Sequence, residues 1–161
     1  MQLNVNSFAD AVMDSIIHPK HQLPIISQKN DGILVNVEKL KSSDYPELQC
    51  WYNCKEHTKE HKGSIVFGWA IFYDSGMYQA QHHAVWQSPD GVLLDVTPDT
   101  DSSISEILFL PDGRVPYDYL NRRFPVSCYY DPTSETLEWC IKDSSLKNLT
   151  PPKDYCYYVA H

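Results

Sequence analysis

The sequence predicts a single α+β domain, residues 1–161, in which a helix packs on an antiparallel β-meander. A chain of 161 residues has the length of one domain and can bury a sizeable core. Three β-rich runs follow one another after two stretches with helical periodicity. Eleven tyrosines and four tryptophans favour β-structure over a helical bundle.

The first helix is predicted in the stretch NSFADAVMDSIIH, where apolar side chains recur on one face. Phe8, Val12 and Ile16 lie four positions apart, and Asn6 or Ser7 would cap the first turn. Two prolines follow closely and end the helical pattern.

A short strand at residues 32–37 and a second helix at 47–62 come next, with Gly63 closing the helix. Pro46 fits the first helical position, which would place Cys50 in the second turn.

The meander is predicted from the β-rich runs 64–73, 77–86 and 91–97. The turn signals DSG and SPDG separate them, so two hairpins should follow in succession. Beyond Pro98, Ser103 and Glu106 match a capping box. The remaining predicted elements are a helix or strand at 107–110, a short helix at 116–123, strands at 126–130 and 137–142, and a proline-broken tail at 147–161.

The formal charge of −8 argues against binding to nucleic acid or to anionic membranes, because both need clustered Lys and Arg. No Sec-type signal and no apolar run of ~20 residues is visible. Five cysteines without a signal indicate reduced thiols. These observations predict a cytoplasmic protein, or one exported by a signal-independent route, and leave the oligomeric state open.

Four potential metal ligands would share one face of the second helix: Cys50, Cys54, His57 and His61. Cys50 and His61 would lie about 16 Å apart along an axis that rises ~1.5 Å per residue, too far for one zinc ion. A zinc site of Cys50 and Cys54, completed by His82 and His83, remains a hypothesis. The C-x-x-x-C spacing is not that of a redox pair. We therefore expect Cys54 to be a core residue and the helical histidines to lie on a solvated face.

A thiol active site is the stronger interpretation of Cys50. A thiol nucleophile needs an imidazole within hydrogen-bond reach and a third group that orients this imidazole. His83 lies on one predicted strand and Asp95 on the next, and a hairpin that closes around Pro89 to Gly91 would place them nearly opposite each other. His82 would point to the other face of its strand.

These residues belong to four short motifs in one order, which are Cys50-x-x-Asn53, Gly68-Trp69, His83-Ala84-Val85-Trp86 and Asp95-Val96-Thr97-Pro98. The sequence in this respect resembles the transglutaminase-like branch of the papain-like cysteine enzymes, and in particular small bacterial members with a single domain. The resemblance covers residues 49–98, within a core motif region of 47–98. It implies a papain-like core with a Cys-His-Asp triad.

In that arrangement Cys50 is the nucleophile, His83 the base and Asp95 the group that orients the imidazole. Asn53, Trp51 and Trp69 are candidate supporting residues, although a buried tryptophan is more often part of a core. The expected activity is hydrolysis or acyl transfer at an amide bond of a peptide, protein or other amide substrate. That covers a protease, amidase, deamidase or transglutaminase-like enzyme, without cofactor or metal. A binding module on the same scaffold and a zinc-stabilised domain are the alternatives.

Overall fold

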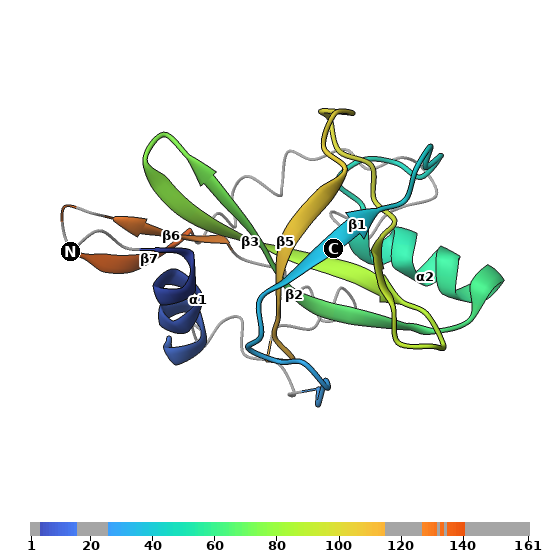
Figure 1. The fold of residues 1–161 in the computed structure, drawn as a ribbon, viewed down its shortest axis with the longest axis horizontal. Helices are drawn as coiled ribbons and strands as arrows, with labels where there is room; N and C mark the ends of the chain where they lie inside the picture. Colours follow the sequence, from blue (N-terminus) through green and yellow to red (C-terminus); the bar gives the residue numbers. More distant parts are fainter. Residues whose placement is uncertain (1–3, 16–25, 115–126, 132, 134, 141–161) are drawn as a thin grey trace.

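The computed structural model describes residues 4–15, 26–114, 127–131, 133 and 135–140. In that part of the chain it contains two helices and seven strands (Figure 1). The helices are α1 (Val5–Asp14) and α2 (Cys50–His61). The strands are β1 (Val35–Lys39), β2 (Ser64–Asp74), β3 (Met77–Gln87), β4 (Leu93–Asp95), β5 (Glu106–Pro111), β6 (Ser127–Asp131) and β7 (Thr136–Cys140). The predicted α+β class is confirmed.

The strands form one sheet in the order β2-β5-β1-β4-β3-β6-β7. Because β2 also pairs with β3, five of these strands close into a barrel, β2-β5-β1-β4-β3, from which β6 and β7 extend. Among the described pairings, β1 with β4 is parallel and the others are antiparallel. The meander of β2, β3 and β4 was predicted, whereas its closure through β1 and β5 was not.

The β2–β3 hairpin is the longest element of the sheet, with eleven residues in each strand. Its turn places Ser75 and Gly76 at φ of 52° and 83°. Two successive positive φ angles in a two-residue loop suit the right-handed twist of the flanking strands. The turn predicted from the DSG signal is therefore confirmed.

The barrel interior is filled by side chains that alternate along each strand. Its buried apolar members are Val37, Val66, Ala70, Val85, Ile107 and Phe109. Side chains of the opposite parity on β2 and β3 point outward and are covered by the two helices. Cys54 of α2 packs among Phe67, Ala84 and Trp86, whereas Trp69, Ile71 and Ala80 pack with α1. The core role expected of Cys54 is confirmed, and burial raises the pKa of its thiol.

Helix α1 begins earlier than predicted, because Asn4 is the cap. The Oδ1 atom of Asn4 accepts a hydrogen bond from the Ser7 backbone N–H at 2.9 Å, so neither Asn6 nor Ser7 caps the helix. Phe8 and Val12 are buried against the sheet, as the periodicity predicted.

Helix α2 is shorter than the predicted 47–62. Leu48 has a positive φ of 61°, so the chain before Cys50 is not helical and Pro46 lies outside the helix. The prediction that Pro46 takes the first helical position is therefore wrong. Cys50 is in the first turn of α2.

The capping-box prediction is also wrong, because Glu106 begins strand β5 and Ser103 instead donates to Asp101. The predicted strands 126–130 and 137–142 correspond to β6 and β7, and the strand predicted at 32–37 corresponds to β1. The helix predicted at 116–123 and the tail at 147–161 lie outside the described residues. No helix in the described part of the chain has both the length and the apolar character to cross a membrane.

Candidate active site

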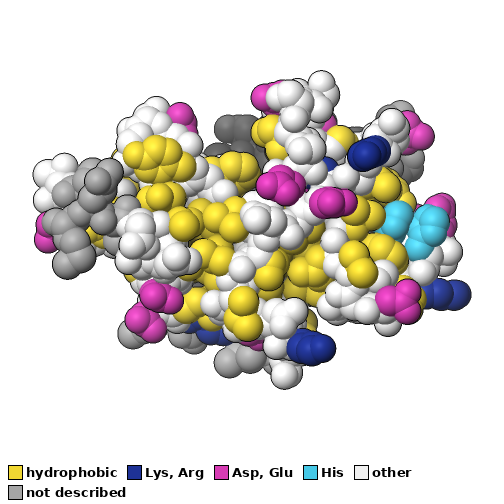
Figure 2. All heavy atoms as spheres, in the orientation of Figure 1, with side chains coloured by type: hydrophobic (Ala, Val, Ile, Leu, Met, Phe, Trp, Pro, Cys, Tyr) yellow, Lys and Arg dark blue, Asp and Glu magenta, His cyan; other side chains and the backbone are white. Residues whose placement is uncertain are grey.

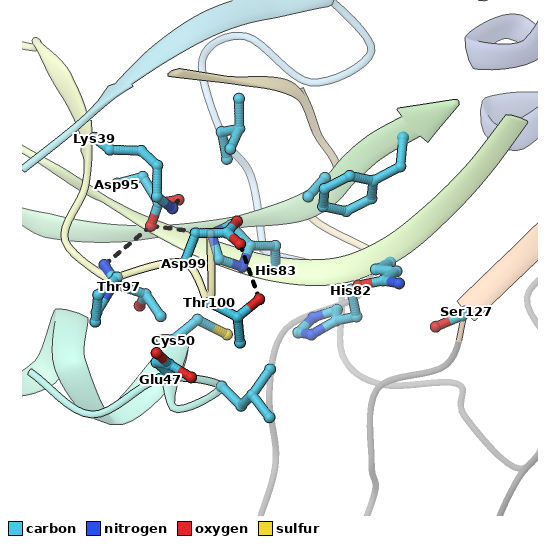
Figure 3. Close-up of a pocket in the computed structure, with 16 residues that line it drawn as sticks. Lys39, Glu47, Cys50, His82, His83, Asp95, Thr97, Asp99, Thr100 and Ser127 are labelled. Atoms are coloured by element: carbon cyan, nitrogen blue, oxygen red, sulfur yellow. Dashed lines mark hydrogen bonds and ion pairs between the residues drawn. The ribbon is translucent and has the colours of Figure 1, made fainter. Parts of the chain in front are cut away.

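A cleft of about 410 Å³ opens at one end of the barrel, next to the start of α2 (Figure 3). Each of the five barrel strands contributes a lining side chain, in chain order Lys39, Ala70, His83, Asp95 and Ile107. Their positions have the same parity as the apolar side chains of the barrel interior. The polar residues of this cleft therefore form the open end of the barrel core.

Cys50 enters the cleft from the first turn of α2. Its side chain is partly exposed and within hydrogen-bond reach of the His83 ring. Backbone N–H groups in the first turn of a helix have no partner within the helix, and they favour a negatively charged sulfur. The thiol is thus accessible from the cleft and lies at the N-terminal end of a helix.

His83 and Asp95 are in contact, with 3.1 Å between Nε2 and Oδ1. The N–H at Nε2 is not aligned for a hydrogen bond to this oxygen, so charge attraction accounts for the contact. The Asp95 side chain is fully buried, whereas 16% of the His83 side chain is exposed. The proximity predicted from the two strands is confirmed.

The register that produces this contact differs from the predicted one. Strands β3 and β4 pair Trp86 with Leu94, which by extension places Asp95 across from Val85. His83 and Asp95 are therefore diagonal neighbours on one face rather than direct cross-strand partners. Asp95 also accepts a hydrogen bond from the Thr97 backbone N–H at 3.1 Å, which holds its Oδ1 atom in place.

The charges of the two residues depend on each other. Burial lowers the pKa of His83, but the charge of Asp95 and the contacts with Asp95 and Cys50 outweigh it and raise the pKa to about 10. Burial likewise raises the pKa of Asp95, yet His83 and Lys39 hold it below its ordinary value. At neutral pH the site thus contains an imidazolium beside a carboxylate, and an imidazolium next to a thiol favours the thiolate.

Lys39 is a member of the site that sequence reasoning missed. Its Nζ atom lies 2.6 Å from Oδ2 of Asp95, and 9% of its side chain is exposed. The parallel pairing of β1 with β4 aligns the two residues directly. A lysine at a strand end carries no local signal of this role, since only closure of the barrel brings it to Asp95.

Asn53 is buried beneath the site rather than directed at the sulfur. Its Nδ2 group donates to the Pro46 carbonyl at 2.8 Å and to Oγ1 of Thr97 at 3.0 Å. Because Thr97 also donates to Asp95, Asn53 ties the start of α2 to the segment that holds the carboxylate. The C-x-x-N spacing alone did not reveal these hydrogen bonds, and the supporting role of Asn53 stays a prediction.

Replacing Asn53 with Ala is expected to lower the free energy of unfolding by about 1–3 kcal/mol, because the buried Thr97 hydroxyl and Pro46 carbonyl lose their donor. Urea denaturation followed by circular dichroism measures the change. Asn36→Ala, at an exposed position of β1, is the control and should change stability by less than about 0.5 kcal/mol. Equal losses of stability in the two variants would contradict the structural role of the Asn53 hydrogen bonds.

The two tryptophans named as candidate supporting residues, Trp51 and Trp69, do not line this cleft. Trp69 is fully buried and its Nε1 donates to Oδ2 of Asp112 at 2.9 Å, so it belongs to the core. Trp51 is partly exposed, with the Lys55 Nζ atom 5.0 Å from its ring centroid.

Of the two helical histidines predicted to lie on a solvated face, only His61 does so. His57 is buried, not solvated: its Nδ1 lies 3.2 Å from the Tyr45 hydroxyl and its ring packs edge-on against Trp86. Burial, with His61 next to it, lowers the pKa of His57. His61 is exposed, as expected. His82 packs near Phe67 and Trp69 on the other face of β3, and it also lines the far end of the cleft towards Ser127 (Figure 3).

The zinc hypothesis finds no ligand cluster among the described residues, where no group of three or more His, Cys, Asp or Glu side chains is placed to hold a metal ion. Comparison with known proteins gives no match, whether to family models, to curated protein sequences or to solved structures. The resemblance to transglutaminase-like enzymes therefore remains a prediction from the motifs, and the site has to be interpreted from its own geometry.

Proposed function

We propose that the protein is a cysteine-dependent hydrolase or acyl transferase that acts on an amide bond. One observation carries this proposal: a thiol at the start of a helix lies within reach of an imidazole, and a buried carboxylate contacts the same imidazole. This is the arrangement that nucleophilic catalysis by cysteine requires. The order of Cys50 on a helix, His83 on a strand and Asp95 on the next strand also supports a papain-like or transglutaminase-like core.

In the first half of the reaction, the Cys50 thiolate attacks the carbonyl carbon of the substrate amide. A carbon–sulfur bond forms, the carbon–nitrogen bond breaks, and the leaving amine takes the proton from the His83 imidazolium. The backbone N–H of Cys50, at the first position of α2, has no acceptor within the helix and can donate to the oxygen that becomes negatively charged.

In the second half, an acceptor attacks the thioester carbonyl carbon while His83 takes the acceptor's proton. The carbon–sulfur bond breaks and Cys50 leaves as a thiolate, which restores the thiolate and imidazolium of the starting site. Asp95 holds the imidazole in place and stabilises its positive charge throughout. Water as acceptor gives hydrolysis, as in a protease, amidase or deamidase, and an amine gives transfer. These steps use the three side chains and the backbone N–H of Cys50, and the proposed chemistry calls for no cofactor.

The cleft suits a peptide or another amide of moderate size, since about 410 Å³ holds a few side chains and both polar and apolar residues line it. On the face shown in Figure 2, the Lys and Arg side chains of the described residues are separated, with acidic side chains among them. This distribution supports the expectation of a partner other than nucleic acid or an anionic membrane.

Alkylation of each cysteine across a range of pH, read by mass spectrometry, tests the proposal. Cys50 should react quickly with iodoacetamide well below pH ~8.5, where an ordinary thiol titrates, and His83→Ala should abolish this reactivity. His61→Ala, at an exposed position of α2, is the matched control and should leave it unchanged. Slow labelling of Cys50 that is indifferent to His83 would contradict the enzyme and favour a binding module.

A further inference from the structure

The buried carboxylate of Asp95 is shared between two cations that come from different strands. Its Oδ1 faces His83 at 3.1 Å and accepts the Thr97 N–H at 3.1 Å, while its Oδ2 faces Lys39 at 2.6 Å. The two oxygens therefore have different partners, as Figure 3 shows. Rotation of the carboxylate would break both contacts at once.

We propose that Lys39 is a positioning residue of the site, which fixes the Asp95 carboxylate and keeps it ionised so that Oδ1 remains available to His83. Lys39 does not contact the sulfur or the imidazole in any described interaction, and it acts through Asp95. The catalytic consequence rests on the proposed function, whereas the effect on the charge of Asp95 does not.

The electrostatic surroundings of Asp95 make this role necessary. The charged and titratable groups that act on it are His83 from β3 and Lys39 from β1, and its charge is also felt by the Cys54 thiol of α2. Cys50 of α2 lines the same cleft. A thiolate at Cys50 would oppose the carboxylate. If the His83 imidazolium were the single cation beside this fully buried carboxylate, and also interacted with the thiolate, Asp95 would take up a proton more readily. Lys39 is the second cation, and its nearly complete burial strengthens the interaction.

Removing the charge of Lys39 is expected to move the protonation of Asp95 towards neutral pH. This protonation is called the acid limb, in the pH profile of the His83 resonances and in that of Cys50 alkylation. In Lys39→Met, Asp95 should take up a proton about one pH unit or more higher than in the wild type, because an opposite charge at this distance lowers a carboxyl pKa by roughly 1–3 units. Lys39→Arg retains the charge and should restore most of the wild-type profile. Lys41→Met removes an exposed lysine two residues away and is the control.

Two readouts separate this inference from the proposed function. The ¹⁵N and ¹H resonances of the His83 ring report protonation of the adjacent Asp95 whether or not the thiol is reactive. The pH profile of Cys50 alkylation reports the consequence for the nucleophile. If the resonances shift as expected while Cys50 is slow in all variants, Lys39 positions the carboxylate but the enzyme proposal fails.

The inference is overturned if Lys39→Met leaves the acid limb where Lys41→Met leaves it. If the role of Lys39 were purely structural, Lys39→Met would lower the free energy of unfolding without moving the acid limb. Should Lys39→Met not fold, the double variant Lys39→Met/Asp95→Asn replaces it, since removing both charges leaves no unpaired ion in the interior. The double variant should then be more stable than Lys39→Met. A double variant that is no more stable than Lys39→Met would also refute the ion pair between Lys39 and Asp95.

Discussion

Asp95→Asn is expected to remove the positive charge of His83 at neutral pH. In the wild type, His83 should keep its proton until about pH 10, because the charge of Asp95 outweighs the effect of burial. Without that charge, burial dominates and the pKa should fall to the ordinary value of 6.5 or below. Titration of the His83 ring by NMR measures both values.

The same substitution should slow alkylation of Cys50 at pH 7 by about 100-fold or more, the range in which a positioned acid–base partner acts. Asp90→Asn, at an exposed turn position, is the control and should alter neither the pKa of His83 nor the alkylation rate. A His83 pKa near 10 in Asp95→Asn would show that another group supplies the charge.

The dependence of stability on pH follows from the same pair. The folded pKa of His83 is raised, so its contribution is complete below about pH 6.5 and is lost as the pH rises towards 10. The folded pKa of Asp95 is lowered, so its contribution is present above 3.8 and is lost as the pH falls through the folded value. Asp95→Asn should therefore flatten the decline in unfolding free energy between pH 6.5 and 10.

Gly68→Ala is expected to have the largest effect on stability. Gly68 pairs with His83 across β2–β3 and with Pro111 across β2–β5, so it lies where three barrel strands meet. A Cβ atom at this position would lie 2.2 Å from the Leu110 carbonyl oxygen and 2.9 Å from the Pro111 Cα. Both are backbone atoms, so β5 must move away from β2.

We expect a loss of about 3 kcal/mol or more in unfolding free energy, measured by chemical denaturation, or failure to fold. Gly76→Ala is the matched control, because a Cβ atom there meets nothing within 4 Å and only its positive φ, 83°, has a cost. That cost is roughly 1–2 kcal/mol. Similar losses in the two variants would mean that the strands adapt easily around Gly68.

Local patterns in the sequence were enough to predict the elements that carry the proposed triad. The β-rich runs of β2 and β3, the DSG turn signal and the helical spacing from Cys50 each act over a few residues, and such patterns are visible in one sequence. The contact between His83 and Asp95 also followed, because a short turn joins their strands.

What the sequence did not reveal depends on partners distant along the chain. The parallel pairing of β1 with β4 joins residues 56 positions apart and leaves no periodic mark near Lys39. The true start of α2 depends on the left-handed backbone at Leu48, an apolar residue that gives no hint of this conformation. The burial of His57 depends on Tyr45 and Trp86, which the helix pattern alone does not include.

The closed barrel also determines how much of the chain must be kept when the site is transplanted. The motif region 47–98 contains all three residues of the proposed triad, yet it lacks β1 and β5, two of the five strands of the barrel. Cut out alone, it would have open edges on β2 and β4 and no lysine for Asp95. The smallest segment that contains the whole barrel is 35–111, so the recognisable motif is a fragment of the unit that a graft has to carry.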